Sequence, residues 1–240
     1  MDQRLSDNEV RVWHARSESC LDDESRRGTL LKILSASERS RCERALIDRV
    51  QRERLLSRAL VRCVLSRYAD VSPEAWRFRE NRFGRPEIVP RHGVPPLRFN
   101  VSHSYGVVTA AFTLGHDVGI DVESLSRSLS VDAVSKFLST AEHEQIAALT
   151  GVAQSDALLR IWTLKEAYAK ARGMGFSLPF DRFSFAVNAR RKPSLACDSE
   201  IDENPGSWQF EQFDITPSHV AAVAVRTEGT ELTLTVEKFE

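Results

Sequence analysis

The chain has 240 residues, and its 33 Lys and Arg against 34 Asp and Glu give a formal net charge of -1. Apolar residues make up 42% and charged residues 28%, which is ordinary for a globular protein large enough to bury a core. This neutral balance argues against a general nucleic-acid binder, and no apolar run is long enough to span a membrane.

The cysteines and the N-terminus indicate the compartment. Four cysteines are present without a C-x-x-C pair, which is typical of reduced thiols rather than a disulfide framework. Residues 1–10 are polar and lack the apolar stretch of a signal peptide. We therefore expect a cytoplasmic protein.

The first part of the chain predicts one strand followed by helices. Apolar and polar residues alternate over 10–14, which indicates a strand, and a helical stretch follows at 22–33. The serine at the start of 35–38 can cap a helix, and 49–68 predicts a long helix with one apolar face. Turn residues occupy 81–86, and the strands 99–101 and 107–112 are separated by 102–106.

Arginines are concentrated in the predicted helical part. Between residues 39 and 67 there are nine arginines against three acidic residues. The arginines are Arg39, Arg41, Arg44, Arg49, Arg52, Arg54, Arg58, Arg62 and Arg67. This local bias predicts an anionic ligand or partner, and the alternative for several of them is a solvated basic face.

The second part of the chain repeats this order of elements. A strand is predicted at 117–122, helices at 130–137, from about 140 and at 157–172, and strands at 183–187, 209–214, 219–225 and 232–236. The segment 99–104 before 107–111 also has an echo in 213–219 before 220–224. We predict an α+β fold of two similar halves, 1–116 and 117–240, with a ligand-binding cleft between them.

Two acidic residues share one predicted strand. Asp121 and Glu123 are two positions apart, so their side chains project from the same face. A divalent cation would relieve their repulsion, and oxygen ligands suit Mg²⁺. The alternative is a solvated acidic face.

A second pair of charged residues lies on the predicted helix 157–172. Glu166 and Lys170 are four residues apart and share a helix face, as do Trp162 and Glu166. A surface ion pair explains them simply. The functional alternative makes Glu166 a third metal ligand or a base, and Lys170 a phosphate ligand.

The segment Asn100–Ser104 offers hydrogen-bonding groups at a strand end. Ser102 and His103 could donate to phosphate oxygens, or a serine here could be a nucleophile beside the histidine. The G-x-S-x-G nucleophile elbow is absent, and His103 could merely brace the turn. Upstream, Arg85 places a cation on the turn before Pro86.

Taken together, these segments resemble the surfactin-synthetase type of 4′-phosphopantetheinyl transferase. The motifs are FNVSHS, then GIDVE, then WTLKEAYAKARGMGF, in that order, with a GRP turn and an arginine-rich helix before them. The resemblance extends from about residue 35 to 225. It departs mildly at Arg85, where many relatives have lysine, and at 174–176, where Gly-x-Gly-Leu is common.

The resemblance assigns roles residue by residue. Asp121, Glu123 and Glu166 match the magnesium ligands, with Mn²⁺ as an alternative ion. Ser102, His103 and Lys170 match phosphate contacts of coenzyme A, and Arg85–Pro86 matches the turn facing its adenosine 3′-phosphate. Arg41 and Arg49 fall near other basic coenzyme contacts. Glu166, Lys170 and His103 are the expected catalytic residues.

The implied reaction transfers 4′-phosphopantetheine from coenzyme A to a serine of an apo-carrier protein and releases adenosine 3′,5′-bisphosphate. The expected partner is an acidic carrier of fatty-acid, polyketide or nonribosomal peptide synthesis, and the enzyme is expected to be a monomer without nucleic-acid or membrane partners. A non-enzymatic coenzyme-binding module and a serine hydrolase on Ser102 or Ser104 are the rival interpretations. The first would lack a carboxylate or the lysine, and none is missing here.

Overall fold

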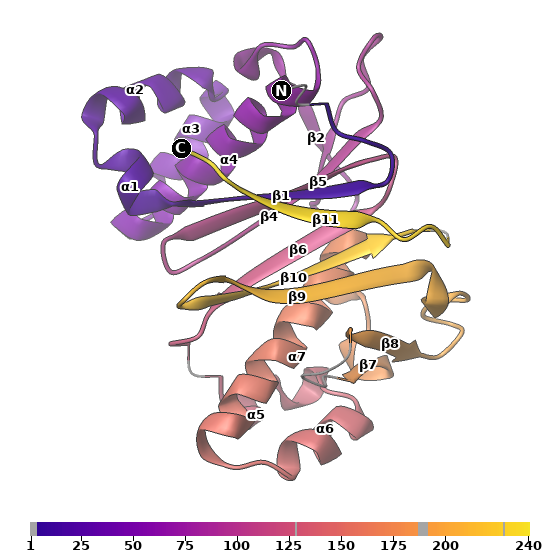
Figure 1. Cartoon of the computed structure of the whole chain (residues 1–240). Coiled ribbons are helices and arrows are strands. Elements are labelled where there is room, and N and C mark those ends of the chain that lie inside the picture. Colours follow the sequence, from indigo (N-terminus) through magenta and orange to yellow (C-terminus); the bar gives the residue numbers. More distant parts are fainter. Residues whose placement is uncertain (1–3, 128, 187–191, 228) are drawn as a thin grey trace.

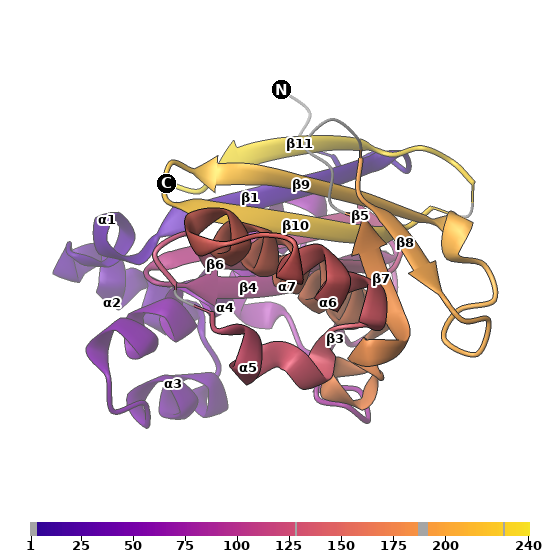
Figure 2. The ribbon, with the colours of Figure 1, turned by 90° about the horizontal axis from the view of Figure 1, so that it is seen from below.

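Two β-sheets form the centre of the molecule, with helices on both outer sides (Figures 1 and 2). The computed structural model describes residues 4–127, 129–186, 192–227 and 229–240. One sheet has the strand order β11-β1-β5-β4 and the other β6-β10-β9. Two small hairpins, β2-β3 and β7-β8, stand apart from these sheets.

The first half of the chain begins with a strand, continues through helices and ends in a strand hairpin. The α-helices of its described residues are α1 (Ser17–Leu21), α2 (Glu24–Ile33), α3 (Ala36–Glu43) and α4 (Asp48–Tyr68). The strands are β1 (Glu9–Arg16), β2 (Phe78–Glu80), β3 (Pro86–Ile88), β4 (Leu97–Ser104) and β5 (Val107–Leu114).

The second half follows the same order of elements. The α-helices of its described residues are α5 (Val131–Val134), α6 (Thr140–Ala147) and α7 (Gly151–Arg172). The strands are β6 (Val118–Ser124), β7 (Phe183–Ala186), β8 (Ser194–Cys197), β9 (Trp208–Thr216), β10 (His219–Arg226) and β11 (Thr233–Lys238).

The two halves share one topology. In each, a first strand pairs antiparallel with the last strand of a terminal hairpin, which gives β1-β5-β4 in one half and β6-β10-β9 in the other. Apolar side chains from both sheets pack together between them, including Val12, Ala111, Ile120 and Val223. The predicted α+β fold of two similar halves is confirmed.

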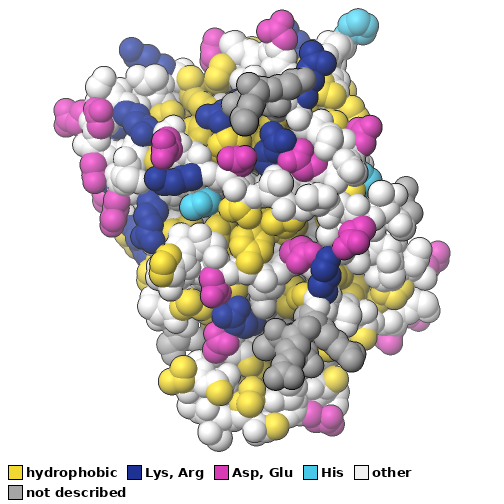
Figure 3. Space-filling view, viewed as in Figure 1, with side chains coloured by type: hydrophobic (Ala, Val, Ile, Leu, Met, Phe, Trp, Pro, Cys, Tyr) yellow, Lys and Arg dark blue, Asp and Glu magenta, His cyan; other side chains and the backbone are white. Residues whose placement is uncertain are grey.

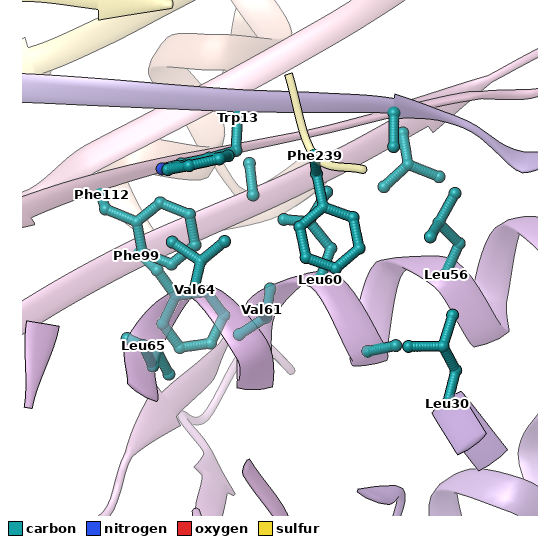
Figure 4. Close-up of a cluster of buried hydrophobic side chains, with 14 of the residues drawn as sticks. Trp13, Leu30, Leu56, Leu60, Val61, Val64, Leu65, Phe99, Phe112 and Phe239 are labelled. Carbon is teal, nitrogen blue, oxygen red and sulfur yellow. The ribbon is translucent and has the colours of Figure 1, made fainter. Parts of the chain in front are cut away.

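The long helix α4 covers the outer face of the first sheet. Its apolar side chains recur at helical spacing and pack against large residues of the strands, as Figure 4 shows for Val64 beside Trp13, Phe99 and Phe112. Helix α7 covers the second sheet in the same way, with Ala222 and Ala224 of β10 in its core cluster. Each half is thus a sheet covered by one long helix.

The start of α3 and the start of α6 use the same device. Ser35 caps α3 and forms a reciprocal capping box with Glu38, and Ser139 caps α6 and does the same with Glu142. Each box satisfies backbone N–H groups that the first helical turn leaves without partners. The serine predicted to begin a helix at 35–38 therefore does so.

The last strand crosses between the halves. β11 pairs in parallel with β1 of the first sheet, and Phe239 directly after it is buried in the core beneath α4 (Figure 4). The backbone oxygen of Phe239 also lies 3.9 Å from Cys20 Sγ. Residues 233–239, within the predicted half 117–240, therefore complete the first sheet. The boundary between 116 and 117 stays a prediction.

Some predicted elements differ at their ends. The strand predicted at 99–101 continues to Ser104, so 102–104 are strand residues and only Tyr105 and Gly106 form the turn. The short hairpin β2-β3 was not predicted, since its strands have three residues each. Residue 187, predicted in a strand, lies outside the described residues. None of the described helices is both long and apolar enough to cross a membrane.

Candidate active site

Side chains rather than backbone bonds join β4 to β6 where the two halves meet. Ser102 Oγ donates to Asp121 Oδ1 over 2.9 Å, and Ser104 Oγ donates to Glu123 Oε2 over 2.9 Å. Asn100 Oδ1 accepts a backbone N–H of β6 over 3.1 Å. Because side chains alternate along a strand, these three residues of β4 face β6 together. These side-chain hydrogen bonds join β4 to β6 along a line that we call the seam, and they hold the two carboxylates of β6 in place.

Two cations bind these carboxylates. Lys170 Nζ donates to Asp121 Oδ1 over 2.6 Å and to Ser102 Oγ over 2.8 Å. Arg127 forms an ion pair with Glu123. Asp121 and Glu123 are 4% and 6% exposed, so their charges depend on these partners.

Helix α7 brings Glu166 and Lys170 to the seam. Trp162, Glu166 and Lys170 are spaced by four and line one cavity of about 330 Å³ together with Asp121 and Glu123. We call it the carboxylate cavity.

Close packing of α7 on β6 depends on a glycine. A Cβ at Gly119 would lie 2.1 Å from the backbone oxygen of Ala167, which is far inside contact distance. Gly119 therefore allows the helix to approach the strand that carries the carboxylates.

The carboxyl groups in this cavity destabilise one another's charges. Burial, followed by the charge of Asp121, raises the pKa of Glu166 to about 7. Burial and Asp121 also raise the pKa of Glu123. A shared cation would favour the ionised forms.

The donor set fits a hard divalent cation. Asp121 Oδ2 is buried without a hydrogen-bond partner among the described residues, so one lone-pair site of the cluster is unsatisfied. Carboxylate oxygens suit Mg²⁺, which keeps several waters and needs few protein ligands. Among the residues described, no three His, Cys, Asp or Glu side chains form a ready-made metal site. The set Asp121, Glu123 and Glu166 stays a prediction.

His103 points away from its serine neighbours, because it occupies the alternate position on β4. Its Nδ1 lies 3.1 Å from Glu53 Oε2 of α4, while Ser102 and Ser104 hydrogen-bond to the carboxylates of β6. Neither Ser102 nor Ser104 therefore forms with His103 the Ser–His pair that a serine hydrolase requires.

A second cavity lies on the α4 side of β4. We call it the arginine cavity, because four arginines line its volume of about 510 Å³: Arg41, Arg44, Arg54 and Arg58. Pro86 also lines it, and Arg41 pairs with Glu80 over 2.9 Å. On the face shown in Figure 3, basic side chains lie over the N-terminal helices. The cavity suits an anion such as a phosphate group.

The two cavities adjoin across β4. Val101 and His103 line both of them. A ligand could therefore extend from the arginines past Val101 and His103 of β4 to the carboxylates.

Two predicted coenzyme contacts lie outside these cavities. Arg49 stacks over the ring of Tyr105 at 4.3 Å. Arg85 donates to the backbone oxygen of Ala171 over 2.7 Å and pairs with Glu87, and it lines a separate cavity of about 380 Å³. The structure thus brings Arg41 and Pro86 to the arginine cavity, and places Arg49 and Arg85 in other contacts.

Several residues of the site were not singled out from the sequence. Arg54 and Arg58 are four apart on α4, but Arg58 and Arg62 have the same spacing, so spacing alone does not identify them among the nine arginines. Arg127 and Glu53 gave no comparable signal, since the sequence does not show which side chains they meet.

Comparisons with known proteins match most of the chain. Residues 117–224 match the family model "4′-phosphopantetheinyl transferase superfamily", and residues 23–113 match "4′-phosphopantetheinyl transferase, N-terminal". The chain is 28% identical to the 4′-phosphopantetheinyl transferase Sfp of Bacillus subtilis over 80% of its length and 82% of the relative.

Two further proteins are similar to this chain. The chain is 33% identical to the 4′-phosphopantetheinyl transferase pptA of Paxillus involutus, over 73% of this chain and 72% of the other. The crystal structure of holo-[acyl-carrier-protein] synthase from Neisseria meningitidis matches with a TM-score of 0.38 and 22% identity, over 45% of this chain and 95% of that one.

Proposed function

The chain belongs to the 4′-phosphopantetheinyl transferase superfamily, and we propose that it transfers the 4′-phosphopantetheine group of coenzyme A to a serine of an apo-carrier protein. In this reaction the serine oxygen forms a bond to the β-phosphorus, the bond to the bridging oxygen breaks, and adenosine 3′,5′-bisphosphate leaves. The serine hydroxyl gives up its proton.

One observation carries this proposal: an arginine-lined cavity and a carboxylate-lined cavity share the wall formed by Val101 and His103. Coenzyme A has a 3′-phosphate at one end of its nucleotide and a diphosphate at the other. The arginine cavity fits the first group, and the carboxylate cavity, with Lys170 and Ser102, fits the second. The four arginines supply positive charge for the nucleotide, including Arg41 among the predicted contacts.

We propose that Asp121, Glu123 and Glu166 hold Mg²⁺ or Mn²⁺. The unpartnered Asp121 Oδ2 and the raised pKa of Glu166, about 7, support this assignment. Such an ion supplies charge neutralisation for a diphosphate. Lys170, already bound to Asp121 and Ser102, is placed to bind the phosphoryl oxygens where charge develops.

We assign the proton transfer to Glu166. Without a metal ion the pKa of Glu166 is raised to about 7, and a bound cation would lower it, so the carboxylate would be ionised and able to accept a proton at neutral pH. His103, at the wall between the cavities, would contact phosphate through Nε2. Further parts of the proposal are an acidic carrier, drawn by the arginine-rich surface, a monomeric enzyme and a cytoplasmic location.

Mass spectrometry of an acceptor tests the proposal. Purified protein, coenzyme A and Mg²⁺ should increase the mass of an apo-carrier by one phosphopantetheine group, and the modified residue should be a serine. Omission of the metal, or Asp121→Asn, should reduce the rate by about a hundredfold or more.

Asp214→Asn is a matched control, because Asp214 is an exposed aspartate of β9 in the same half. It should leave the rate unchanged. If no tested carrier gains mass, or if chelation leaves the rate intact, the proposed function or its metal dependence is wrong.

A further inference from the structure

Glu53 is a buried carboxylate that the proposed reaction does not use. Its side chain on α4 is 5% exposed, and it lines neither the arginine cavity nor the carboxylate cavity. A buried carboxylate requires hydrogen-bond donors. Glu53 has two: Gly106 donates its backbone N–H to Oε1 over 2.5 Å, and the His103 ring lies with Nδ1 3.1 Å from Oε2.

The ionised state of Glu53 decides the direction of the bond to His103. Burial acts to raise the pKa of Glu53, but the hydrogen bonds from His103 and Gly106 outweigh it and hold the pKa below its ordinary value. An ionised carboxylate can only accept. The proton of this contact therefore belongs to His103 Nδ1.

The proton on Nδ1 also determines the state of the other ring nitrogen, Nε2. With Nδ1 protonated, Nε2 of a neutral ring carries a lone pair, and Nε2 is the nitrogen that gains a proton when the ring becomes charged. The His103 side chain is 39% exposed and lines both cavities, and Nε2 has no hydrogen-bond partner among the described residues.

We propose that Glu53 is a positioning residue: it holds the Nδ1 proton of His103 and thereby presents Nε2 to the phosphate groups of the ligand. Phosphate oxygens and the Glu53 carboxylate both accept, so a ring held between them donates from both nitrogens, and the Nε2–H of such a charged ring is a strong donor to phosphate. This inference rests on the proposed function for the identity of the ligand, coenzyme A. The tautomer of His103 can be read without any ligand.

The Glu53 carboxylate accepts from the Gly106 N–H and from His103 Nδ1, and Glu53→Gln separates these two roles. If the substituted amide keeps its oxygen on the Gly106 N–H, its NH₂ group faces His103 and needs an acceptor there. The ring should then change to the tautomer with the proton on Nε2. The variant keeps the side-chain shape, so folding is checked simply by its melting temperature.

Nitrogen NMR of histidine-labelled protein measures the tautomer. The chain has six histidines, so the spectrum of His103→Ala assigns the His103 signals. At a pH where the ring is neutral, the wild-type protein should show Nδ1–H and Glu53→Gln should show Nε2–H. Either a wild-type ring with Nε2–H or a variant ring that keeps Nδ1–H overturns the proposal.

Gly106→Ala is the control for a merely structural role of Glu53. Gly106 has φ of 85°, so alanine strains the β4–β5 turn that Glu53 also holds, while the carboxylate stays in place. We expect His103 to keep Nδ1–H in this variant. A change to Nε2–H would mean that the turn, and not the carboxylate, sets the tautomer.

A double-mutant cycle on coenzyme A binding completes the test. Glu53→Gln should weaken binding, measured by calorimetry, by about fivefold in the wild-type background and by less than about twofold in His103→Ala. An equal loss in both backgrounds would show that Glu53 does not act through His103. If the wild-type protein does not bind coenzyme A at all, the proposed function fails, while the NMR result still decides the tautomer.

Discussion

The two halves share a scaffold and differ in the charges that they present. In the first half, Glu38 of the α3 capping box pairs with Arg62 of α4, and in the second, Glu142 of the α6 capping box pairs with Lys165 of α7. Each pair ties a short helix to the long helix that covers the sheet.

The cavity-lining rows of the two long helices differ. α4 contributes Arg54 and Arg58 to the arginine cavity, whereas α7 contributes Glu166 and Lys170 to the carboxylate cavity. The shared fold fixes the position of the cavity-lining side chains on each helix, and the residue types at these positions decide which ligand the cavity suits. A repeated fold can thus hold both an anion and a cation side by side.

Removing the acidic residue from each buried pair should produce the largest difference between the halves, measured as a loss in the free energy of unfolding. Lys165 and Glu142 are 0% and 1% exposed, so Glu142→Ala leaves a buried charge and should lower the free energy of unfolding by about 3–5 kcal/mol. Glu38→Ala should cost only about 1–3 kcal/mol, because Arg62 keeps the backbone oxygens of Pro73 and Trp76.

Urea unfolding of both variants measures these costs. The double variant Glu142→Leu with Lys165→Met should recover part of the loss, since it leaves no unpaired charge. Equal costs for Glu142→Ala and Glu38→Ala would contradict the difference in burial between the two pairs.

The halves should also respond oppositely to pH in metal-free protein. The pKa of Glu166 is raised to about 7, so the folded state binds this proton more tightly than the unfolded chain, and stability falls as pH rises from about 4.5 to 7. Glu166→Gln should remove this fall and be more stable than the wild type at pH 8 by about 2 kcal/mol, after allowance for solvent screening.

Glu38 should change stability with pH in the opposite direction. Burial acts to raise its pKa, but the backbone N–H of Ser35 and the Arg62 guanidinium lower it below the ordinary value. Its contribution to stability is present at neutral pH and is lost as pH falls below about 4.5. Chemical unfolding in chelator across this pH range compares Glu166→Gln with Glu38→Gln; a Glu166→Gln curve parallel to the wild type would refute the first expectation.

Charge removal from the two long helices should affect ligand binding in only one half. Arg58→Ala should weaken coenzyme A binding by about tenfold, because it removes one cation from the arginine cavity. Arg160→Ala on α7 is the matched control, since Arg160 pairs with Asp156 and Asp214 outside both cavities. Calorimetry with coenzyme A would count against the assignment of the arginine cavity if both variants bound equally well.

The smallest effect should be the same in both halves. Ser35→Ala and Ser139→Ala each remove the cap of one helix and should each cost about 1 kcal/mol in the free energy of unfolding. Thermal and urea unfolding of the two variants would reveal whether the caps are energetically equivalent. A large difference would show that the two capping boxes do not contribute equally to the free energy of unfolding.

The sequence predicted the elements whose pattern is local. The apolar spacing on 49–68 identifies α4 and the serine at 35 identifies α3. Each of these signals is carried by residues that are close to one another in the sequence. The alternation of Asp121 and Glu123 likewise predicted that both would face one cavity, which they do. Short elements such as β2 and β3 carry too few residues for any period to appear.

Contacts between distant segments could not be predicted in this way. Arg54 and Arg58 belong to the site because β4 runs beside α4, and Arg49, five residues before Arg54 on the same helix, stacks on Tyr105 instead. The pairing of Glu53 with His103 joins residues about fifty positions apart. Helix spacing limits such choices, but only the packing of the sheet against the helix makes them.

The crossing of β11 has a consequence for how the polypeptide is made. A ribosome releases the N-terminal residues first, yet the place beside β1 is filled by 233–238 and the gap beneath α4 by Phe239. The first half must therefore wait, with an unfinished sheet edge and part of its apolar interior uncovered, until residues 233–239 have been synthesised. The first sheet is therefore begun before the second sheet and completed after it, because β10 ends at Arg226 and β11 begins at Thr233.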